Sequence, residues 1–600
     1  MSRRGATLAA CLVSGLVIAG CASGGVAITQ SVRHGTGTNS TTGKTTTGKT
    51  TAGKTTAGNT TAGNTTVADA GGDDGLPAVE PAAWTTCHDY PAPWDCATIS
   101  VPLDYSDSAG AHLSIAMIRL AAARPSARIG SLLVNPGGPG GSGIALAYGE
   151  AQSYPQQMLD SFDIIGFDPR GVGDSSPVLC PASFDSGSGS RSGSGAGSGS
   201  GSGNYDVCIP ANKSVLPLLG TTNVARDMDM IRRSVGDTQL NFLGYSYGTA
   251  LGAVFADMFP TRVRAMVLDG AVNPDAGRSN NSGGGIDFYA EQDFDGTIAD
   301  FEQLCDATAN CPAGPHTASL VARVRKKIGE LPVDKFPGGG RLSKNNLDDI
   351  LTGAMYSAFD WPALAFALKD ADNGDGSTLA AFSSYLVYGY PADSTSETEL
   401  DFANIAIRCA DFSDRGSESQ ECKNFPASDE ALPVITKVTT SSPILVVGTK
   451  GDPATPARYS PLMARALADA VAIEWEGAGH TATLTSRCIT ALVADYLVAL
   501  AVPKDGTKCP FVTGTTTLAG SADVVFGSPD RATSTSNIVD VLVALGQTKR
   551  VAGCIAPQLV QRSDRRMILD ELLGIETPQL IAVRKLIERG CTANATPPGG

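Results

Sequence analysis

Gly244-Tyr245-Ser246-Tyr247-Gly248 is the stretch of this 600-residue sequence that decides the fold. A strand-like run, 239–243, leads into it, a helix-like run rich in small residues, 249–259, follows, and a second strand-like run occupies 263–268. Small residues two positions either side of a serine let the backbone turn tightly between strand and helix and expose the hydroxyl. The chain holds 69 glycines, so the pattern alone is weak, but the strand-helix-strand context predicts that Ser246 is a nucleophile.

A serine hydroxyl needs a base to accept its proton, and this base is usually a histidine oriented by a carboxylate. His480 follows the apolar run 471–473 and the loop 476–479, which places it at the carboxyl end of a predicted strand, where parallel sheets carry their sites. The sequence therefore predicts His480 as the base. The five histidines of the chain include four others without such a context, namely His34, His88, His112 and His316.

The carboxylate of such a triad is expected between the serine and the histidine along the chain. Asp452 lies in the loop 449–456, directly after the short apolar strand predicted at 443–448. The alternative is Asp269, which follows the strand after the nucleophile helix, although Asp269-Gly270 also reads as an ordinary turn. We favour Asp452 as the acid.

A tetrahedral oxyanion requires preorganised backbone N–H donors. The residue after the nucleophile, Tyr247, supplies one. The strand-like run 132–134 leads into a glycine-rich loop, 135–143, in which Gly138 is the predicted second donor. A phosphate-binding loop is the competing interpretation, but the Gly-Lys-Ser/Thr ending that it requires is missing.

Six motifs stand at 135–143, 167–175, 244–248, 268–270, 451–452 and 479–480. In combination they resemble the α/β-hydrolase fold family of prolyl aminopeptidases, and most closely the secreted bacterial tripeptidyl aminopeptidases and their lipoprotein relatives. The resemblance spans roughly 83–510 and implies a mostly parallel sheet with helices on both faces. It also implies a serine exopeptidase that acts on peptides with a free N-terminus, with no cofactor and no metal. Pro136 stands where the prolyl enzymes usually carry His, which favours the tripeptidyl branch.

The resemblance also points to an acid on the cap, or near its return, that binds the substrate ammonium. Asp411 in the stretch 406–411 is the candidate, because a carboxylate beside an ammonium gains a charge-assisted hydrogen bond. The alternative is that Asp411 caps a helix or lies in a solvated loop beside a disulfide.

The first residues predict export and anchoring. Arg3 and Arg4 precede a short apolar core, 8–17, which is too short to span a bilayer, and Ile18-Ala19-Gly20-Cys21 resembles a bacterial lipobox. Cys21 would carry the lipid and attach the enzyme to the extracytoplasmic face of the bacterial membrane. The residues after the arginine pair are not the hydrophobic ones of a twin-arginine signal, so the general secretory route is favoured.

Shifts in composition divide the chain into a core interrupted by a cap. The N-terminal tether repeats Thr, Gly and Lys or Asn without apolar periodicity, and a cap over the serine would exclude long or folded chains. The predicted segments are a signal peptide (1–20), a lipidated flexible tether (21–82), the first half of the core (83–274) with a Ser/Gly-rich insertion (186–203), a mainly helical cap (275–434), the second half of the core (435–510) and a small helical appendix (511–600).

The chain has fourteen cysteines, and twelve remain when Cys11 in the signal and Cys21 are set aside. An even number in an exported protein predicts disulfides, and neighbour pairing is the simplest proposal, with metal binding as the alternative. Absence of a Cys-x-x-Cys pair disfavours zinc. The proposed pairs are Cys87 with Cys96, Cys180 with Cys208, Cys305 with Cys311, Cys409 with Cys422, Cys488 with Cys509, and Cys554 with Cys591.

The formal net charge of −15 disfavours nucleic acid and anionic lipid surfaces as partners, because both require positive patches. Two other functions stay open beside the peptidase. An esterase or lipase would use the same triad with a purely apolar channel, whereas an anchored binding protein would not react with serine-directed reagents.

Overall fold

The computed structural model describes residues 76–90, 92–181, 205–274, 293–307, 311–333, 342–380, 382, 394–411, 422–426, 428, 430, 432–433 and 435–511. Several predictions lie outside this part of the chain: the signal peptide, the lipidated Cys21 and nearly all of the tether, the Ser/Gly-rich insertion, the Cys554–Cys591 pair and nearly all of the C-terminal appendix.

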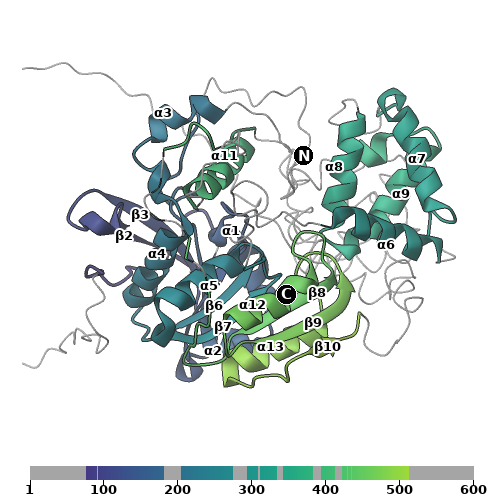
Figure 1. Ribbon diagram of the computed structural model, residues 1–600. Helices are drawn as coiled ribbons and strands as arrows, with labels where there is room; N and C mark the ends of the chain where they lie inside the picture. Colours follow the sequence, from purple (N-terminus) through teal and green to yellow (C-terminus); the bar gives the residue numbers. More distant parts are fainter. Residues whose placement is uncertain are drawn as a thin grey trace, which may run out of the picture. The chain divides into compact units, whose positions relative to one another are not determined.

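One ten-stranded sheet runs through the described core, in the order β1-β2-β3-β5-β4-β6-β7-β8-β9-β10 (Figure 1). Strands β1, β2, β3 and β5 pair antiparallel, and all pairs from β5 across to β10 are parallel. The strands are β1 (Thr85–Thr86), β2 (Trp94–Pro102), β3 (His112–Leu120), β4 (Gly130–Asn135), β5 (Phe162–Phe167), β6 (Leu240–Tyr245), β7 (Val263–Asp269), β8 (Leu445–Gly451), β9 (Val471–Ala478) and β10 (Thr507–Cys509).

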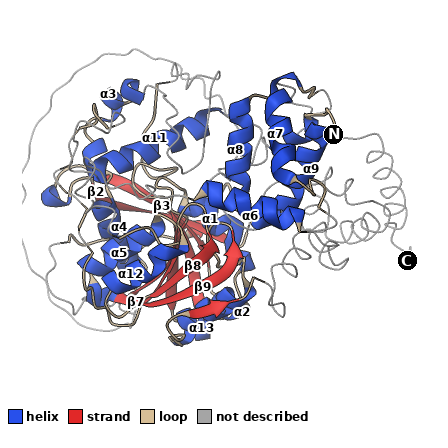
Figure 2. Cartoon of the chain, turned by 45° about the vertical axis from the view of Figure 1, so that its right-hand side comes forward, coloured by secondary structure: helices blue, strands red, loops and turns tan. Residues whose placement is uncertain are grey.

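Helices connect the parallel strands and cover both faces of the sheet. The helices are α1 (Gly143–Glu150), α2 (Gln156–Ser161), α3 (Ile209–Asn212), α4 (Thr221–Ser234), α5 (Gly248–Met258), α6 (Phe294–Asp306), α7 (Thr317–Lys327), α8 (Lys344–Ala354), α9 (Trp361–Asp372), α11 (Ser394–Asp411), α12 (Ser460–Ala466) and α13 (Arg487–Ala499). Figure 2 shows α4, α5 and α12 on one side of the strands and α2 and α13 on the other. Every residue of β4, β5 and β6 is buried, as expected for parallel strands covered on both faces.

Alternate residues of the strands point into two separate hydrophobic clusters. Leu133, Phe242 and Met266 pack with α4, α5 and α12, whereas their neighbours Leu243 and Val267 pack with α1, α2 and α13. The period-two alternation of a strand explains this division, because successive side chains leave opposite faces of the sheet. The predicted α/β-hydrolase arrangement, a mostly parallel sheet with helices on both faces, is confirmed.

The segment between the two halves of the core contributes helices of two kinds. Helices α6 to α9, which we call the cap helices, bury a hydrophobic cluster of their own that includes Phe301, Trp361 and Leu364. Helix α11 is different, because its Phe402 and Ile407 belong to the cluster shared with α4 and α5. Figure 1 shows the cap helices as a group to which α11 does not belong.

Five of the proposed disulfides are present among the described residues. They join Cys87 to Cys96, Cys180 to Cys208, Cys305 to Cys311, Cys409 to Cys422, and Cys488 to Cys509. Among the described residues, no helix has both the length and the apolar character needed to cross a membrane.

Candidate active site

The turn between β6 and α5 holds Ser246 in a strained conformation. Its φ of 56° lies in the left-handed region, which non-glycine residues adopt rarely and mostly where the surroundings enforce it. The Ser246 N–H donates to the carbonyl of Asp269 at 2.9 Å, and the Ser246 carbonyl accepts from the Thr249 hydroxyl at 2.6 Å. These bonds fix the backbone of the serine between the ends of β6 and β7.

Two glycines flank the serine because no side chain fits at either position. A Cβ at Gly244 would lie 2.5 Å from the carbonyl oxygen of Gly248, and a Cβ at Gly248 would lie 2.9 Å from Oδ1 of Asn135. Real Cβ atoms essentially never come this close to such atoms. The Gly-x-Ser-x-Gly spacing is therefore a packing requirement of the turn.

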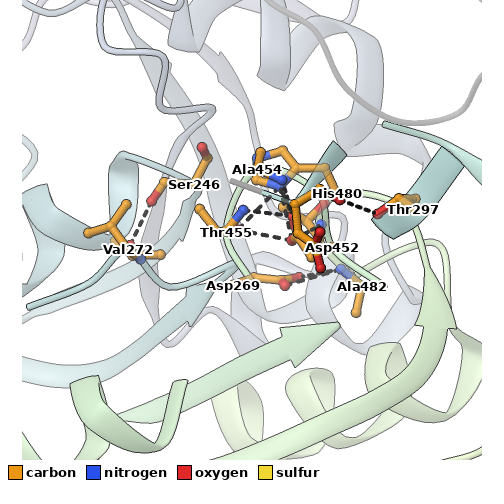
Figure 3. Close-up of polar contacts among 12 residues, drawn as sticks. Ser246, Asp269, Val272, Thr297, Asp452, Ala454, Thr455, His480 and Ala482 are labelled. Atoms are coloured by element: carbon orange, nitrogen blue, oxygen red, sulfur yellow. Dashed lines mark hydrogen bonds and ion pairs between the residues drawn. The ribbon is translucent and has the colours of Figure 1, made fainter. Parts of the chain in front are cut away.

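His480 and Asp452 meet at the ends of β9 and β8. Nδ1 of His480 lies 3.0 Å from both carboxylate oxygens of Asp452, and both side chains are buried (Figure 3). A carboxylate can only accept, so Nδ1 carries the proton and Nε2 is left as the basic nitrogen. This arrangement gives His480 the tautomer that a general base requires.

Backbone and hydroxyl donors hold the Asp452 carboxylate in place. The N–H groups of Ala454 and Thr455 donate to Oδ1 at 2.9 and 2.8 Å, the Thr455 hydroxyl donates to Oδ2 at 2.9 Å, and the N–H of Thr481 reaches Oδ2 at 3.2 Å (Figure 3). Hydrogen bonds to a carboxylate stabilise its charged form. An ionised Asp452 can in turn stabilise the imidazolium that forms when His480 accepts a proton.

Asp269, the alternative acid, has a different set of partners. Its carboxylate accepts from the N–H of Ala482 at 3.1 Å and from that of Thr483 at 2.7 Å, and no contact with the His480 ring is recorded among the described residues (Figure 3). Burial raises the pKa of Asp269, an effect that these hydrogen bonds oppose. The structure thus places Asp452 at the histidine ring and Asp269 beneath the loop that carries the histidine.

Gly270 lies beside the His480 ring and directly follows the residue that holds the Ser246 backbone. A Cβ at Gly270 would lie 3.4 Å from Cε1 of His480, and Gly270 directly follows Asp269, whose carbonyl binds the Ser246 N–H. No hydrogen bond joins the Ser246 hydroxyl to His480 among the described residues. Catalytic hydrogen bonds are often long without substrate and tighten only in the substrate complex.

The glycine-rich loop lies against the nucleophile turn. A Cβ at Gly137 would lie 2.8 Å from the backbone N of Tyr247, so the two segments that carry the predicted oxyanion donors are in backbone contact. At the end of the loop, the Ser142 hydroxyl accepts from the N–H of Ala145 at the start of α1 and donates to Asp168 at 2.5 Å. Burial raises the pKa of Asp168 to about 6. The loop that carries Gly138 therefore lies against the backbone of Tyr247.

Comparison with known proteins agrees with this geometry. Residues 130–486 match the family described as alpha/beta hydrolase fold. The chain belongs to this family. Together with the family, the buried Asp452–His480 pair beside a strained serine makes the chain a serine hydrolase.

Three relatives illustrate the range of names within the family. The hydrolase is 30% identical over 483 residues to serine protease Hip1 of Mycobacterium tuberculosis, an alignment that covers 72% of this chain and 91% of that protein. It is 31% identical over 492 residues to carboxylesterase B of the same species, covering 73% and 92%. It is 31% identical over 316 residues to tripeptidyl aminopeptidase of Streptomyces lividans, covering 49% and 57%.

Asp411 of the hydrolase is buried at the end of α11, with its carboxylate facing the core. Oδ1 accepts from the N–H of Thr221 at 2.6 Å, Oδ2 accepts from the Thr221 hydroxyl at 2.6 Å, and the Tyr247 hydroxyl lies 3.4 Å from Oδ2. Burial raises the pKa of Asp411 to about 7. The predicted amine-binding carboxylate is therefore already engaged by three protein donors.

The turn between α8 and α9 touches the catalytic loop of the hydrolase, a contact that the sequence did not indicate. The Tyr356 carbonyl accepts from the N–H of His480 at 2.7 Å, and the two rings meet edge to face with centroids 5.4 Å apart. Ser357 also forms an isolated antiparallel bridge with Gly479. Sequence motifs identify catalytic groups but not such partners, because a tyrosine in a helical cap carries no distinguishing pattern.

The described residues of the hydrolase include no cluster of three or more His, Cys, Asp or Glu side chains placed to hold a metal ion. The chemistry available at the site is acyl transfer through the serine, with the histidine as base and backbone N–H groups as electrostatic stabilisers.

Proposed function

We propose that this hydrolase is a serine exopeptidase that removes tripeptides or single residues from the free N-termini of short peptides. The observation that carries the proposal is the contact of the α8–α9 turn with His480, which sets cap residues at the catalytic histidine. A cap at this place restricts the site to short or unfolded chain ends. The relatives named serine protease Hip1 and tripeptidyl aminopeptidase support a peptide substrate.

The proposed reaction passes through an acyl-enzyme. Nε2 of His480 takes the hydroxyl proton of Ser246, the oxygen attacks the scissile carbonyl, and the carbonyl oxygen becomes an oxyanion held by the N–H groups of Tyr247 and Gly138. The imidazolium, stabilised by Asp452, then protonates the leaving amine. Water attacks the ester in the second half-reaction, with His480 again as the base.

Recognition of a free N-terminus requires a group that distinguishes an ammonium from an amide. An ionised carboxylate does this, because burial of an unpaired ammonium is costly whereas a charge-assisted hydrogen bond offsets that cost. Asp411 is the candidate taken from the family resemblance. Its engagement by Thr221 and Tyr247 means that a substrate ammonium would have to share the carboxylate with them or displace them.

The test is a substrate panel for the mature protein beside a Ser246→Ala control. The panel contains free and N-acetylated di-, tri- and tetrapeptide amides together with short-chain esters. We expect cleavage of the free-amine tripeptide amides, a loss of about 10⁶-fold in Ser246→Ala, as for removal of a triad serine, and rejection of the acetylated series. Equal cleavage of free and acetylated peptides would overturn the exopeptidase proposal.

A carboxylesterase is the second candidate, favoured by the similarity to carboxylesterase B. The same triad attacks an ester, and the leaving alcohol needs no ammonium anchor. Hydrolysis of the esters with all peptides untouched would establish this alternative.

We also propose that the hydrolase is exported and held at the extracytoplasmic face of the membrane by a lipid on Cys21. The lipobox-like Ile18-Ala19-Gly20-Cys21 after a short apolar core supports it. Metabolic labelling with a radioactive fatty acid tests it. Label should enter the wild-type protein and be absent from a Cys21→Ala variant, whereas label retained by that variant would exclude Cys21 as the lipid site.

A further inference from the structure

Helix α11 contacts both backbone segments that carry the predicted oxyanion donors. One contact involves the glycine-rich loop and the other involves the nucleophile turn, and they come from two positions on the same helix, Asn404 and Asp411.

The first contact fixes the glycine-rich loop. Nδ2 of Asn404 donates to the carbonyl of Pro139 at 2.8 Å, one residue beyond the predicted donor Gly138. The helix backbone is close as well, because a Cβ at Gly140 would lie 3.1 Å from the backbone N of Asn404. Gly140 has a φ of +91°, so this close approach coincides with a loop conformation that favours glycine.

The second contact fixes the nucleophile turn through a chain of hydroxyl groups. The Thr221 hydroxyl contacts the Tyr247 hydroxyl and donates to Oδ2 of Asp411 at 2.6 Å, while the Tyr247 hydroxyl lies 3.4 Å from the same oxygen. Both hydroxyl groups are therefore oriented toward one carboxylate. These contacts hold the hydroxyl end of the Tyr247 side chain. The backbone N–H of the same residue is the other predicted oxyanion donor.

Packing holds the helix against the core. Phe402 is fully buried and lies over Tyr205 and Phe425, with ring centroids 5.9 and 6.1 Å apart. A disulfide between Cys409 and Cys422 fastens the end of α11 that carries Asp411. A helix anchored in this way can act as a rigid support for the groups that it contacts.

We propose that α11 is a positioning element for the oxyanion hole, in which Asn404 sets the glycine-rich loop and Asp411, through Thr221, sets Tyr247. The inference rests on the acyl-transfer chemistry proposed for Ser246, and it holds for peptide and ester substrates alike. It gives Asp411 a role that does not depend on the substrate's amine. Oxyanion donors contribute only when they point at the position of the developing charge, so loss of either contact reduces stabilisation of the transition state and leaves ground-state binding intact.

The experiment compares Asn404→Ala, Thr221→Val and Tyr247→Phe with wild type. Thr221→Val and Tyr247→Phe remove single hydroxyl groups and keep every backbone N–H. The matched control is Asn424→Ala, which removes an amide bonded to Asp206 at 2.6 Å on the exposed surface. Each protein is assayed on a free-amine tripeptide amide and on p-nitrophenyl acetate, and its labelling by a fluorophosphonate is timed.

We expect each of the three variants to lower kcat about 10-fold on both substrates, since loss of an entire oxyanion donor costs about 100- to 1,000-fold. KM should stay within about 2-fold, and labelling should slow in step with kcat, as expected for an interaction made only in the transition state. Thr221→Val combined with Tyr247→Phe should be no slower than either alone, because both break one chain of hydroxyl groups. The control should match wild type.

Two results would overturn the proposal. One is wild-type kcat on the ester and wild-type labelling in all three variants. The other is an Asp411→Asn variant that loses activity only on the free-amine peptide, through a raised KM, because this pattern belongs to an ammonium anchor. If wild type cleaves esters alone, the exopeptidase proposal fails while the ester and labelling arms still test the role of α11.

Discussion

The carbonyl of Tyr356 accepts a hydrogen bond from the N–H of His480 at 2.7 Å, and the tyrosine ring meets the imidazole edge to face. A residue between two cap helices therefore contacts the proposed base, both at its backbone and at its ring. The imidazole of His480 thus contacts the cap through the Tyr356 ring and Asp452 through Nδ1. Changes in the cap are thereby expected to affect catalysis as well as substrate choice.

We expect Tyr356→Ala to lower kcat about 10-fold on esters and peptides alike, because a displacement of about 1 Å at a catalytic group can cost about 100-fold. Tyr356→Phe keeps the ring and the backbone carbonyl and should retain activity. Steady-state kinetics of both variants provide the measurement. If Tyr356→Ala raises KM with kcat unchanged, the ring contacts substrate and does not position His480.

Substitution of the two buried aspartates should have different effects, on kcat for Asp452 and on the free energy of unfolding for Asp269. Asp452→Asn should lower kcat about 10⁴-fold with little change in stability, since an amide favours the wrong tautomer of the histidine. Asp269→Ala should instead reduce the free energy of unfolding by about 1–3 kcal/mol, because the N–H groups of Ala482 and Thr483 would be buried without partners.

Urea unfolding together with kinetics distinguishes the two effects. A loss of about 10⁴-fold in a stable Asp269→Asn variant, with Asp452→Asn still active, would reverse the assignment of the acid.

The sequence was sufficient to predict the fold and the approach of His480 to Asp452, and the physical reason is local. Gly244 is required by its contact with the Gly248 carbonyl within the turn, and the buried strands β6 to β8 are visible in the sequence as apolar runs. Partners supplied by distant segments could not be predicted in this way. Asn404, Thr221 and Tyr356 reach the site from helices and turns whose own sequence is ordinary, so only the folded chain reveals their contacts.

Asp411 illustrates the same limit in another form. The sequence identifies Asp411 as an acid near the return of the cap. It does not show that the Asp411 carboxylate accepts hydrogen bonds from the N–H and the hydroxyl of Thr221. The alternative of a helix cap was close to the observed role, because Thr221 is the first residue of α4 and its N–H has no partner within that helix. The helix that Asp411 caps is a neighbouring one, which sequence adjacency does not show.

Gly137 should not tolerate a side chain. Its φ is +89°, and a Cβ would lie 2.5 Å from the Tyr245 carbonyl and 2.8 Å from the Tyr247 N. We expect Gly137→Ala to displace the glycine-rich loop and lower kcat about 100-fold or more, comparable to loss of an oxyanion donor.

Gly149→Ala in α1 is the matched control, because nothing lies within 4 Å of a Cβ there. It should keep full activity and gain up to about 1 kcal/mol in stability from improved helix propensity. Kinetics and thermal unfolding of both variants give the comparison, and a fully active Gly137→Ala would show that the loop adapts.

Asp360 should make the hydrolase less stable as the pH rises. Burial raises the pKa of this carboxyl to about 7, and its carboxylate has no recorded hydrogen bond or ion pair within the described part of the chain. Between about pH 4 and pH 7, Asp360 is therefore protonated in the folded state but ionised in the unfolded state. Over that range the free energy of unfolding falls by about 1.4 kcal/mol for each unit by which the two pKa values differ. Asp360→Asn should be more stable than wild type at pH 8 and equal to it below pH 4.

Asp372 should show the opposite pH dependence of stability, because hydrogen bonds from Arg323 and Lys327 lower its pKa. Asp372→Asn should therefore lose a small amount of stability at pH 7 and none in acid. Urea unfolding of the three proteins between about pH 2 and pH 8 measures both slopes, with the Asp372 effect below about pH 4 and the Asp360 effect above it. Parallel curves for wild type and Asp360→Asn would show that Asp360 ionises normally in the folded state.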